Sequence, residues 1–122
     1  MKIAITSTGP EMDSPVDERF GRSRYLVIAD LETGDFEAVD NRANMEAAQG
    51  AGVQAAQEIV SRGVNWLLTG HVGPKAFQAL SVGGVSMGVG ASGTVRETIH
   101  RFKSGGFAQA ETTDVRKSTK WG

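Results

Sequence analysis

The spacing of hydrophobic residues along this chain changes near residue 52. Before that point, three short segments predict strands: 2–6, which alternates and is rich in β-branched residues, 25–29 and 36–39. The turn chemistry of residues 32–35, Glu-Thr-Gly-Asp, predicts that the second and third strands form an antiparallel hairpin.

After residue 52, apolar residues recur at helical spacing, and the helical segments alternate with short apolar runs. The first helix is predicted to end at Gly63, because glycine is a common C-terminal stop. The run 64–68 predicts a strand covered on both faces. Pro74 then suits the first turn of the next helix.

The last third of the chain repeats this alternation once. Residues 85–89 predict a strand. Thr94 and Glu97 have the spacing of a capping box and precede an apolar stripe, so they predict the start of a helix. This helix is expected to end at the Ser-Gly-Gly run 104–106. The element order is therefore β-β-β-α-β-α-β-α.

This order predicts an α/β fold with a mixed sheet flanked by helices. Right-handed crossovers make the last two strands parallel to the first and leave the hairpin as an antiparallel extension. Ligands of open α/β sheets bind outside the carboxyl ends of the parallel strands. Three loops are expected to meet there: 7–21, 70–75 and 88–94.

Length and composition indicate one globular domain. The 122 residues are 39% hydrophobic and 22% charged, and no apolar run approaches the ~20 residues of a membrane span. A strand-like pattern begins at Lys2 without the apolar region of a signal peptide, so we expect a cytoplasmic protein. The domain is expected to cover residues 1–107, followed by a flexible polar tail over 108–122.

Cysteine content and charge exclude several classes of function. The chain has no cysteine, which excludes disulfides, thiolate catalysis and every cysteine-ligated metal site. A net charge of −1 argues against a general binder of polyanions. The 16 glycines, about 13% of the chain against a usual ~7%, follow no low-complexity period.

The segment from Thr69 to Lys75, Thr-Gly-His-Val-Gly-Pro-Lys, is the first candidate for chemistry, because it joins a predicted strand to a predicted helix. Glycines let backbone amides approach a ligand, and a helix start adds the positive end of its dipole. The segment therefore favours an anion. His71 can donate to that anion, ligate a soft metal, or simply bond to the backbone as a turn residue.

Two further segments offer anion donors. In Arg19-Phe20-Gly21-Arg22 the arginines supply planar forks for oxyanions, unless the loop is ion-paired to neighbouring carboxylates with Phe20 in the core. In Gly50-Ala51-Gly52 the glycines can form an amide cradle or simply permit close helix packing. Two other functions stay open: a metal-dependent phosphate hydrolase or nuclease using Asp13, Asp17 and Glu18, and a nucleotide-binding regulatory module.

Five motifs together resemble the dinitrogenase iron-molybdenum cofactor biosynthesis family over about residues 1–107, most closely its molybdenum-copper orange proteins of sulfate-reducing bacteria. The motifs occur in this order: Lys2-Ile3-Ala4-Ile5, Ser14-Pro15-Val16-Asp17 with Arg19-Phe20-Gly21-Arg22, Gly50-Ala51-Gly52, Thr69 to Phe77, and Gly90-Ala91-Ser92-Gly93-Thr94-Val95. The resemblance implies a ribonuclease H-like fold with a five-stranded mixed sheet. It also implies a protein that is not an enzyme and holds a molybdenum-containing metal-sulfide cluster noncovalently.

The resemblance implies a molybdenum-copper sulfide cluster or a related molybdenum-iron-sulfur cofactor as cargo. Such a cluster brings its own sulfides, so a chain without cysteine can act as an anion receptor. The expected contacts are Arg19, Phe20, Gly21, Arg22, Gly50, Gly52, Gly70, His71, Val72, Gly73, Pro74, Lys75, Gly90, Ala91, Ser92, Gly93 and Thr94, with His71 as the candidate metal ligand. We expect a monomer or weak dimer that works with proteins of a cofactor-assembly or cell-division complex and contacts neither nucleic acid nor membrane.

Overall fold

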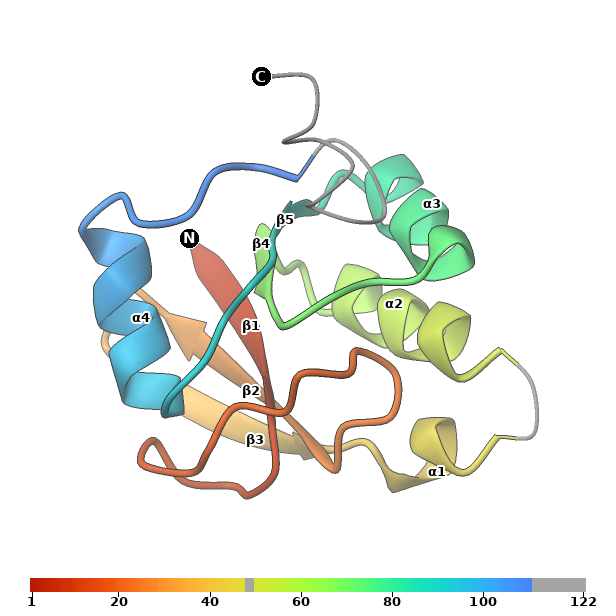
Figure 1. Ribbon diagram of the computed structural model, residues 1–122, viewed down its shortest axis with the longest axis horizontal. Helices are drawn as coiled ribbons and strands as arrows, with labels where there is room; N and C mark the ends of the chain where they lie inside the picture. Colours follow the sequence, from red (N-terminus) through yellow and green to blue (C-terminus); the bar gives the residue numbers. More distant parts are fainter. Residues whose placement is uncertain (48–49, 111–122) are drawn as a thin grey trace.

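A five-stranded mixed sheet with the order β3-β2-β1-β4-β5 forms the centre of the computed structural model (Figure 1). The structure describes residues 1–47 and 50–110. The strands are β1 (Lys2–Ser7), β2 (Tyr25–Asp30), β3 (Phe36–Asp40), β4 (Trp66–Leu68) and β5 (Ser86–Gly88). The helices are α1 (Arg42–Met45), α2 (Ala51–Ser61), α3 (Pro74–Val82) and α4 (Val95–Lys103).

The predicted topology is confirmed. β1 pairs antiparallel with β2 and parallel with β4, β2 pairs antiparallel with β3, and β4 pairs parallel with β5. The α/β class and the mixed sheet follow directly from this pairing. The capping box is also present, because the Thr94 hydroxyl accepts from the Glu97 N–H while the Glu97 carboxylate accepts from the Thr94 N–H.

Three local predictions differ from the structure. β4 begins at Trp66 rather than residue 64, because the Val64 N–H still bonds to the Ile59 carbonyl at the end of α2. β5 begins one residue late for the same reason, since the Val85 N–H bonds to the Leu80 carbonyl of α3, and it ends at Gly88 rather than residue 89. The sequence analysis also missed α1, whose four residues are too few to show a period.

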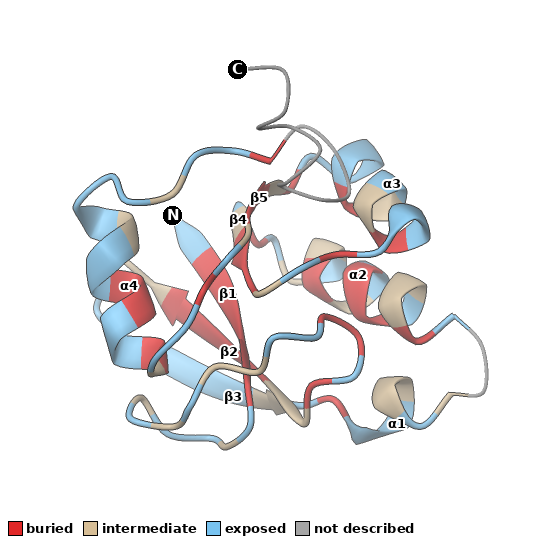
Figure 2. Ribbon diagram, in the orientation of Figure 1, coloured by how far each residue is buried: buried red, intermediate tan, exposed pale blue. Residues whose placement is uncertain are grey.

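Helices cover both faces of the sheet (Figure 1). On one face, α2 and α3 pack against a core that includes Ala4, Leu26 and Ile28. On the other face, α4 packs against the second core, which includes Ile3, Ile5 and Val27. Figure 2 shows buried positions in α2, α3 and α4, whereas α1 has none. The register explains the division, because odd and even residues of one strand point to opposite faces.

The chain after α4 wraps the β5 edge of the sheet. Phe107 packs against the core on the α4 side, whereas Ala110 belongs to the core on the α2 and α3 side. The Ala110 N–H donates to the Met87 carbonyl at 2.7 Å. Most of the predicted tail, residues 111–122, lies outside the described residues, so the boundary at residue 107 stays a prediction. No helix among the described residues is long and apolar enough to cross a membrane.

Candidate anion-binding site

The three predicted loops meet at the carboxyl ends of β1, β4 and β5. The His71 N–H donates to the Glu18 carbonyl at 3.0 Å, and the Gly90 N–H donates to the Gly70 carbonyl at 2.9 Å. The Val16 N–H donates to the Gly93 carbonyl at 2.8 Å. Residues distant in sequence are therefore joined by backbone hydrogen bonds around one end of the sheet.

Two buried hydroxyl groups, which the sequence analysis missed, anchor this junction. Thr6 at the end of β1 and Thr69 after β4 are fully buried, and their Oγ1 atoms lie 2.7 Å apart. The Thr6 hydroxyl donates to the Asp17 carbonyl at 2.5 Å. These bonds hold the loop before Arg19 against the turn that carries His71. Threonine is common in strands, so only the meeting of β1 and β4 distinguishes this pair.

Two glycines lie where one segment packs closely against the backbone of another, and their expected contact with a cluster stays a prediction. A Cβ atom on Gly70 would lie 2.4 Å from the Glu18 carbonyl oxygen. On Gly21, which has a φ of +93°, a Cβ atom would lie 2.7 Å from the Cα of Gly52. Backbone packs against backbone at both places. The loop of residues 19–22 is thereby held against the start of α2.

An open hollow of about 560 Å³ lies between the loop of residues 19–22 and the starts of α2 and α3. Nine of the expected contact residues line it: Arg19, Phe20, Arg22, Gly50, Gly52, His71, Gly73, Pro74 and Lys75. Ala51, Val53 and Ala76 line it as well and were not predicted. Their only signal in the sequence is their place in the first turns of the two helices.

The starts of α2 and α3 line the hollow and carry no side-chain cap from the part of the chain that the structure describes. The N-caps of α2 and α3 are Gly50 and Gly73, without a side-chain cap and without an acidic residue in the first turn. The first helical hydrogen bonds run from Gln54 to Gly50 and from Phe77 to Gly73, each at 2.9 Å. The earlier N–H groups therefore have no acceptor within their helices. Two positive dipole ends converge on the same space.

Within residues 1–47 and 50–110, the charged side chains that line the hollow are basic: Arg19, Arg22 and Lys75. The Arg19 side chain is 65% exposed, and its Nε lies 3.7 Å from Asp17 Oδ1. Arg22 donates from Nη1 to the Met45 carbonyl at 2.6 Å and makes no ion pair with any residue the structure describes. The alternative that the arginines of this loop are ion-paired to neighbouring carboxylates therefore applies to Arg19 only, through its 3.7 Å contact with Asp17. Phe20 is 8% exposed and belongs to the core, as that alternative expected.

His71 is exposed at the rim of the hollow, and its backbone is bonded to Glu18. Within the described ranges, no group of three or more His, Cys, Asp or Glu side chains gathers to hold a metal ion. Asp13 pairs instead with Arg96 at 2.9 Å, and the Asp17 carboxylate accepts from the Arg19 N–H. The carboxylate cluster that a metal-dependent hydrolase needs is not formed by Asp13, Asp17 and Glu18.

The remaining expected residues support the hollow from outside. Val72 and Ala91 are buried, and the Ala91 N–H bonds to the Thr69 carbonyl at 3.0 Å. Gly90 and Gly93 bond to neighbouring loops, and the Thr94 side chain caps α4. The structure thus does not bring residues 90–94 into the hollow, although Ser92 and Gly93 are exposed beside α4. Their role as cofactor contacts stays a prediction.

Comparison with known proteins matches this arrangement to one family. The chain is 43% identical to the apo form of the orange protein from Desulfovibrio gigas, with a TM-score of 0.90 over 93% of this chain and 95% of that one. A NifB-like protein of the DUF35 family from Thermotoga has 36% identity and a TM-score of 0.81 over 93% of this chain and 96% of its own.

A more distant relative is an uncharacterized protein of Methanocaldococcus jannaschii, 27% identical over 91% of this chain and 92% of its own length. The model of the family described as dinitrogenase iron-molybdenum cofactor matches residues 1–105, which include every residue that lines the hollow. The chain therefore belongs to the dinitrogenase iron-molybdenum cofactor family.

Proposed function

We propose that this protein is a carrier, not an enzyme, and that it holds a molybdenum-containing metal-sulfide cluster noncovalently in the hollow. The cargo is a molybdenum-copper sulfide or an iron-molybdenum cofactor of the kind named by the family. One observation carries the proposal: two helix N-termini without a side-chain cap and three basic side chains line the hollow, and none of its described lining residues is acidic.

The chemistry of the lining suits a large, soft polyanion. Amides and guanidinium groups neutralise charge without replacing the sulfides of a cluster. The chain supplies no thiolate, so the cluster has to bring its own bridging sulfides. An added Cβ on Gly73 would meet no atom within 4 Å, so the space beside this amide is open to a ligand.

His71 is the residue that decides between two modes of binding. Its imidazole can ligate copper or molybdenum directly, or it can donate a hydrogen bond to a sulfide. The ribonuclease H-like description of the fold, the cytoplasmic location and partners from a cofactor-assembly or cell-division complex belong to the same proposal.

Reconstitution tests the proposal. Apo protein is mixed with tetrathiomolybdate and copper and desalted, and molybdenum and copper are measured beside the optical spectrum. We expect both metals to stay with the protein, and their loss on the column would contradict the proposal. His71→Ala should leave retention and spectrum unchanged if amides and shape dominate, and should shift the spectrum if the imidazole ligates.

The alternative of a nucleotide-binding module uses the same donors, because phosphate is also an anion. Calorimetry with ATP and GTP separates the two, since a receptor for metal sulfides should give no saturable heat with nucleotides. Arg19→Gln combined with Lys75→Gln serves as the matched variant. It should weaken thiomolybdate binding and make the remaining binding less sensitive to salt.

A further inference from the structure

Arg101, in the last turn of α4, donates hydrogen bonds to two carbonyl groups outside its own helix. Its Nη1 donates to the Gly90 carbonyl at 3.0 Å, and its Nε donates to the Gly106 carbonyl at 3.1 Å. No carboxylate of residues 1–47 or 50–110 forms an ion pair with it. The guanidinium group therefore joins two backbone segments instead of neutralising a negative charge.

An aromatic ring restricts the guanidinium group of Arg101 further. The Cζ atom lies 3.9 Å from the centroid of the Phe107 ring, which is the geometry of a cation–π contact. Phe107 is closely packed, because a Cβ atom on Gly88 would lie 2.9 Å from its Cδ1. The planar group is thus held by a ring and by two carbonyl groups. A lysine ammonium has a single nitrogen and cannot occupy both donor positions.

Gly90 links Arg101 to the turn that follows β4. Its carbonyl accepts from Arg101, while its N–H donates to the Gly70 carbonyl at 2.9 Å. The next residue adds a second bond to the same turn, since the Ala91 N–H donates to the Thr69 carbonyl at 3.0 Å. The place of the Gly90 loop therefore depends on α4 on one side and on the turn on the other.

The turn that follows β4 forms one wall of the hollow. Gly70 packs against the backbone of Glu18, and the His71 N–H donates to the Glu18 carbonyl at 3.0 Å. Gly73, at the end of the turn, is the N-cap of α3. His71 and Gly73 both line the hollow, whereas none of its described lining residues belongs to α4. A shift of the Gly90 loop consequently reaches the hollow through Gly70.

We propose that Arg101 is a positioning residue for the anion site. Through Gly90 it holds the turn after β4 so that His71 and the first N–H groups of α3 face the bound anion, as residues behind a site fix those that touch the ligand. α4 lies on the opposite face of the sheet from α2 and α3 (Figure 1), so this link crosses from one face to the other at the carboxyl ends of β4 and β5. The role rests on the proposed function, because it needs an anion in the hollow.

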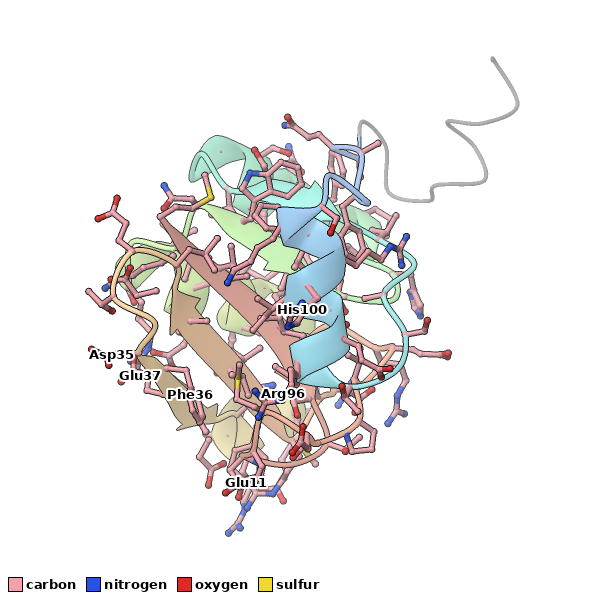
Figure 3. The ribbon with its side chains drawn as sticks, turned by 90° about the vertical axis from the view of Figure 1, so that its left-hand side faces the viewer. Glu11, Asp35, Phe36, Glu37, Arg96 and His100 are labelled. Atoms are coloured by element: carbon pink, nitrogen blue, oxygen red, sulfur yellow. The ribbon has the colours of Figure 1, made fainter. Side chains whose placement is uncertain are left out.

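Arg96 provides a matched control, because it is a second arginine on the same helix. Figure 3 shows Arg96 and His100 on the exposed surface of α4, and Arg96 pairs with Asp13 at 2.9 Å. Arg96→Gln removes the same charge from α4 as Arg101→Gln does, but it leaves the hydrogen bond to Gly90 intact.

Calorimetric titration of the full chain with tetrathiomolybdate tests the role. We expect Arg101→Gln to raise the dissociation constant about fivefold, the effect of losing one net hydrogen bond. Arg101→Lys keeps the charge without the bridge between two carbonyls, so it should bind as weakly as Arg101→Gln. Arg96→Gln should bind like the native chain. Equal weakening by Arg96→Gln, or native affinity in Arg101→Lys, would assign the effect to charge alone and overturn the proposal.

Backbone amide signals in NMR spectra of the apo chain separate positioning from general stability. We expect Arg101→Gln to shift the signals of Gly70 and His71, whereas Arg96→Gln leaves them unchanged. A residue that only stabilises α4 would lower the free energy of unfolding without moving these two signals, and that result would overturn the proposal.

The titration also distinguishes this role from the function on which it rests. If the native chain binds tetrathiomolybdate and Arg101→Gln binds it equally well, Arg101 has no positioning role and the proposed function stands. If the native chain does not bind tetrathiomolybdate at all, the proposed function fails and the role of Arg101 fails with it.

Discussion

The N-terminus of α4 differs from those of α2 and α3, although all three helices follow a glycine-containing loop. α4 is closed by its own side chains, through Thr94 and Glu97. α2 and α3 begin at Gly50 and Gly73, without a side-chain cap or an acidic first turn. A capping carboxylate satisfies the first amides and neutralises the dipole, whereas an uncapped start leaves both for a ligand. The contrast separates a helix start that stabilises the fold from two that can bind an anion.

The strongest test of this contrast is to displace the turn that brings α3 to the hollow. Gly70→Val places a side chain against the backbone of Glu18, which cannot move aside without separating the loops. We expect the free energy of unfolding to fall by about 3 kcal/mol in urea denaturation. Gly73→Ser is the control, because its side chain enters open space and serine caps helices well. A Gly70→Val protein as stable as the native chain would show that the loops are not tightly joined.

Converting the α3 start into an α4-like start should abolish anion binding without harming the fold. Gly73→Asp supplies a capping carboxylate, so stability should hold within about 0.5 kcal/mol. The same carboxylate enters the hollow, and the affinity for tetrathiomolybdate should fall at least tenfold, or about 1.4 kcal/mol. Gly73→Asn has nearly the same shape without the charge and isolates the electrostatic effect. If the Gly73→Asp and Gly73→Asn variants bind tetrathiomolybdate with equal affinity, the start of α3 is not part of the binding site.

The reverse change at α4 should affect stability alone. Thr94→Ala deletes the cap and should cost about 1 kcal/mol in thermal or urea unfolding. Metal retention after reconstitution should not change, because Thr94 does not line the hollow. Glu97→Gln keeps a side chain that can accept from the Thr94 N–H and should cost less. If Thr94→Ala releases the metals, the loop of residues 90–94 contributes to binding after all.

The smallest expected effect concerns the start of α1, whose first amide is bound by a carboxylate. The Arg42 N–H donates to Asp40 at 2.8 Å and Arg24 lies 2.6 Å from the same oxygen, which lowers the pKa of Asp40 below its ordinary value of 3.8. A carboxylate whose pKa is lowered by folding stabilises the folded chain at pH values above its pKa in the unfolded chain. This stabilisation is lost as the pH falls through the lower pKa of the folded chain. Asp40→Asn should therefore flatten the decline in stability below pH 3.8 slightly, without changing anion binding at pH 7. If the stability of the Asp40→Asn variant declines with falling pH as steeply as that of the native chain, the Asp40 carboxylate makes no such contribution.

The fold was largely predictable because its signals are local. Short runs of strand-forming residues predicted β1, β2 and β3, and helical periodicity predicted α2, so the mixed sheet followed from connection rules. The capping box of α4 was readable because both of its residues lie within one turn. The boundaries at Val64 and Val85 were less accurate, since apolar residues continue through the last turn of each helix into the strand.

The candidate site was predictable only in part. Arg19, His71 and Lys75 were named from residue type and from their place in turns. Ala51, Val53 and Ala76 were not, because apolar residues near helix starts are common and only their free amides matter here. The close backbone packing at Gly21 and Gly70 was not predicted, since a contact with a residue distant in sequence has no local signal.

The sequence by itself determined the order of strands and helices, the absence of thiol chemistry and the basic residues of segments 19–22 and 69–75. The tertiary structure decided which glycines join loops and which leave amides open, and it excluded residues 90–94 from the hollow. It also placed β3 at one edge of the sheet. The reason is physical: propensity and periodicity depend on neighbours along the chain, whereas close approach, burial and the direction of an unpaired N–H depend on segments that meet only after folding.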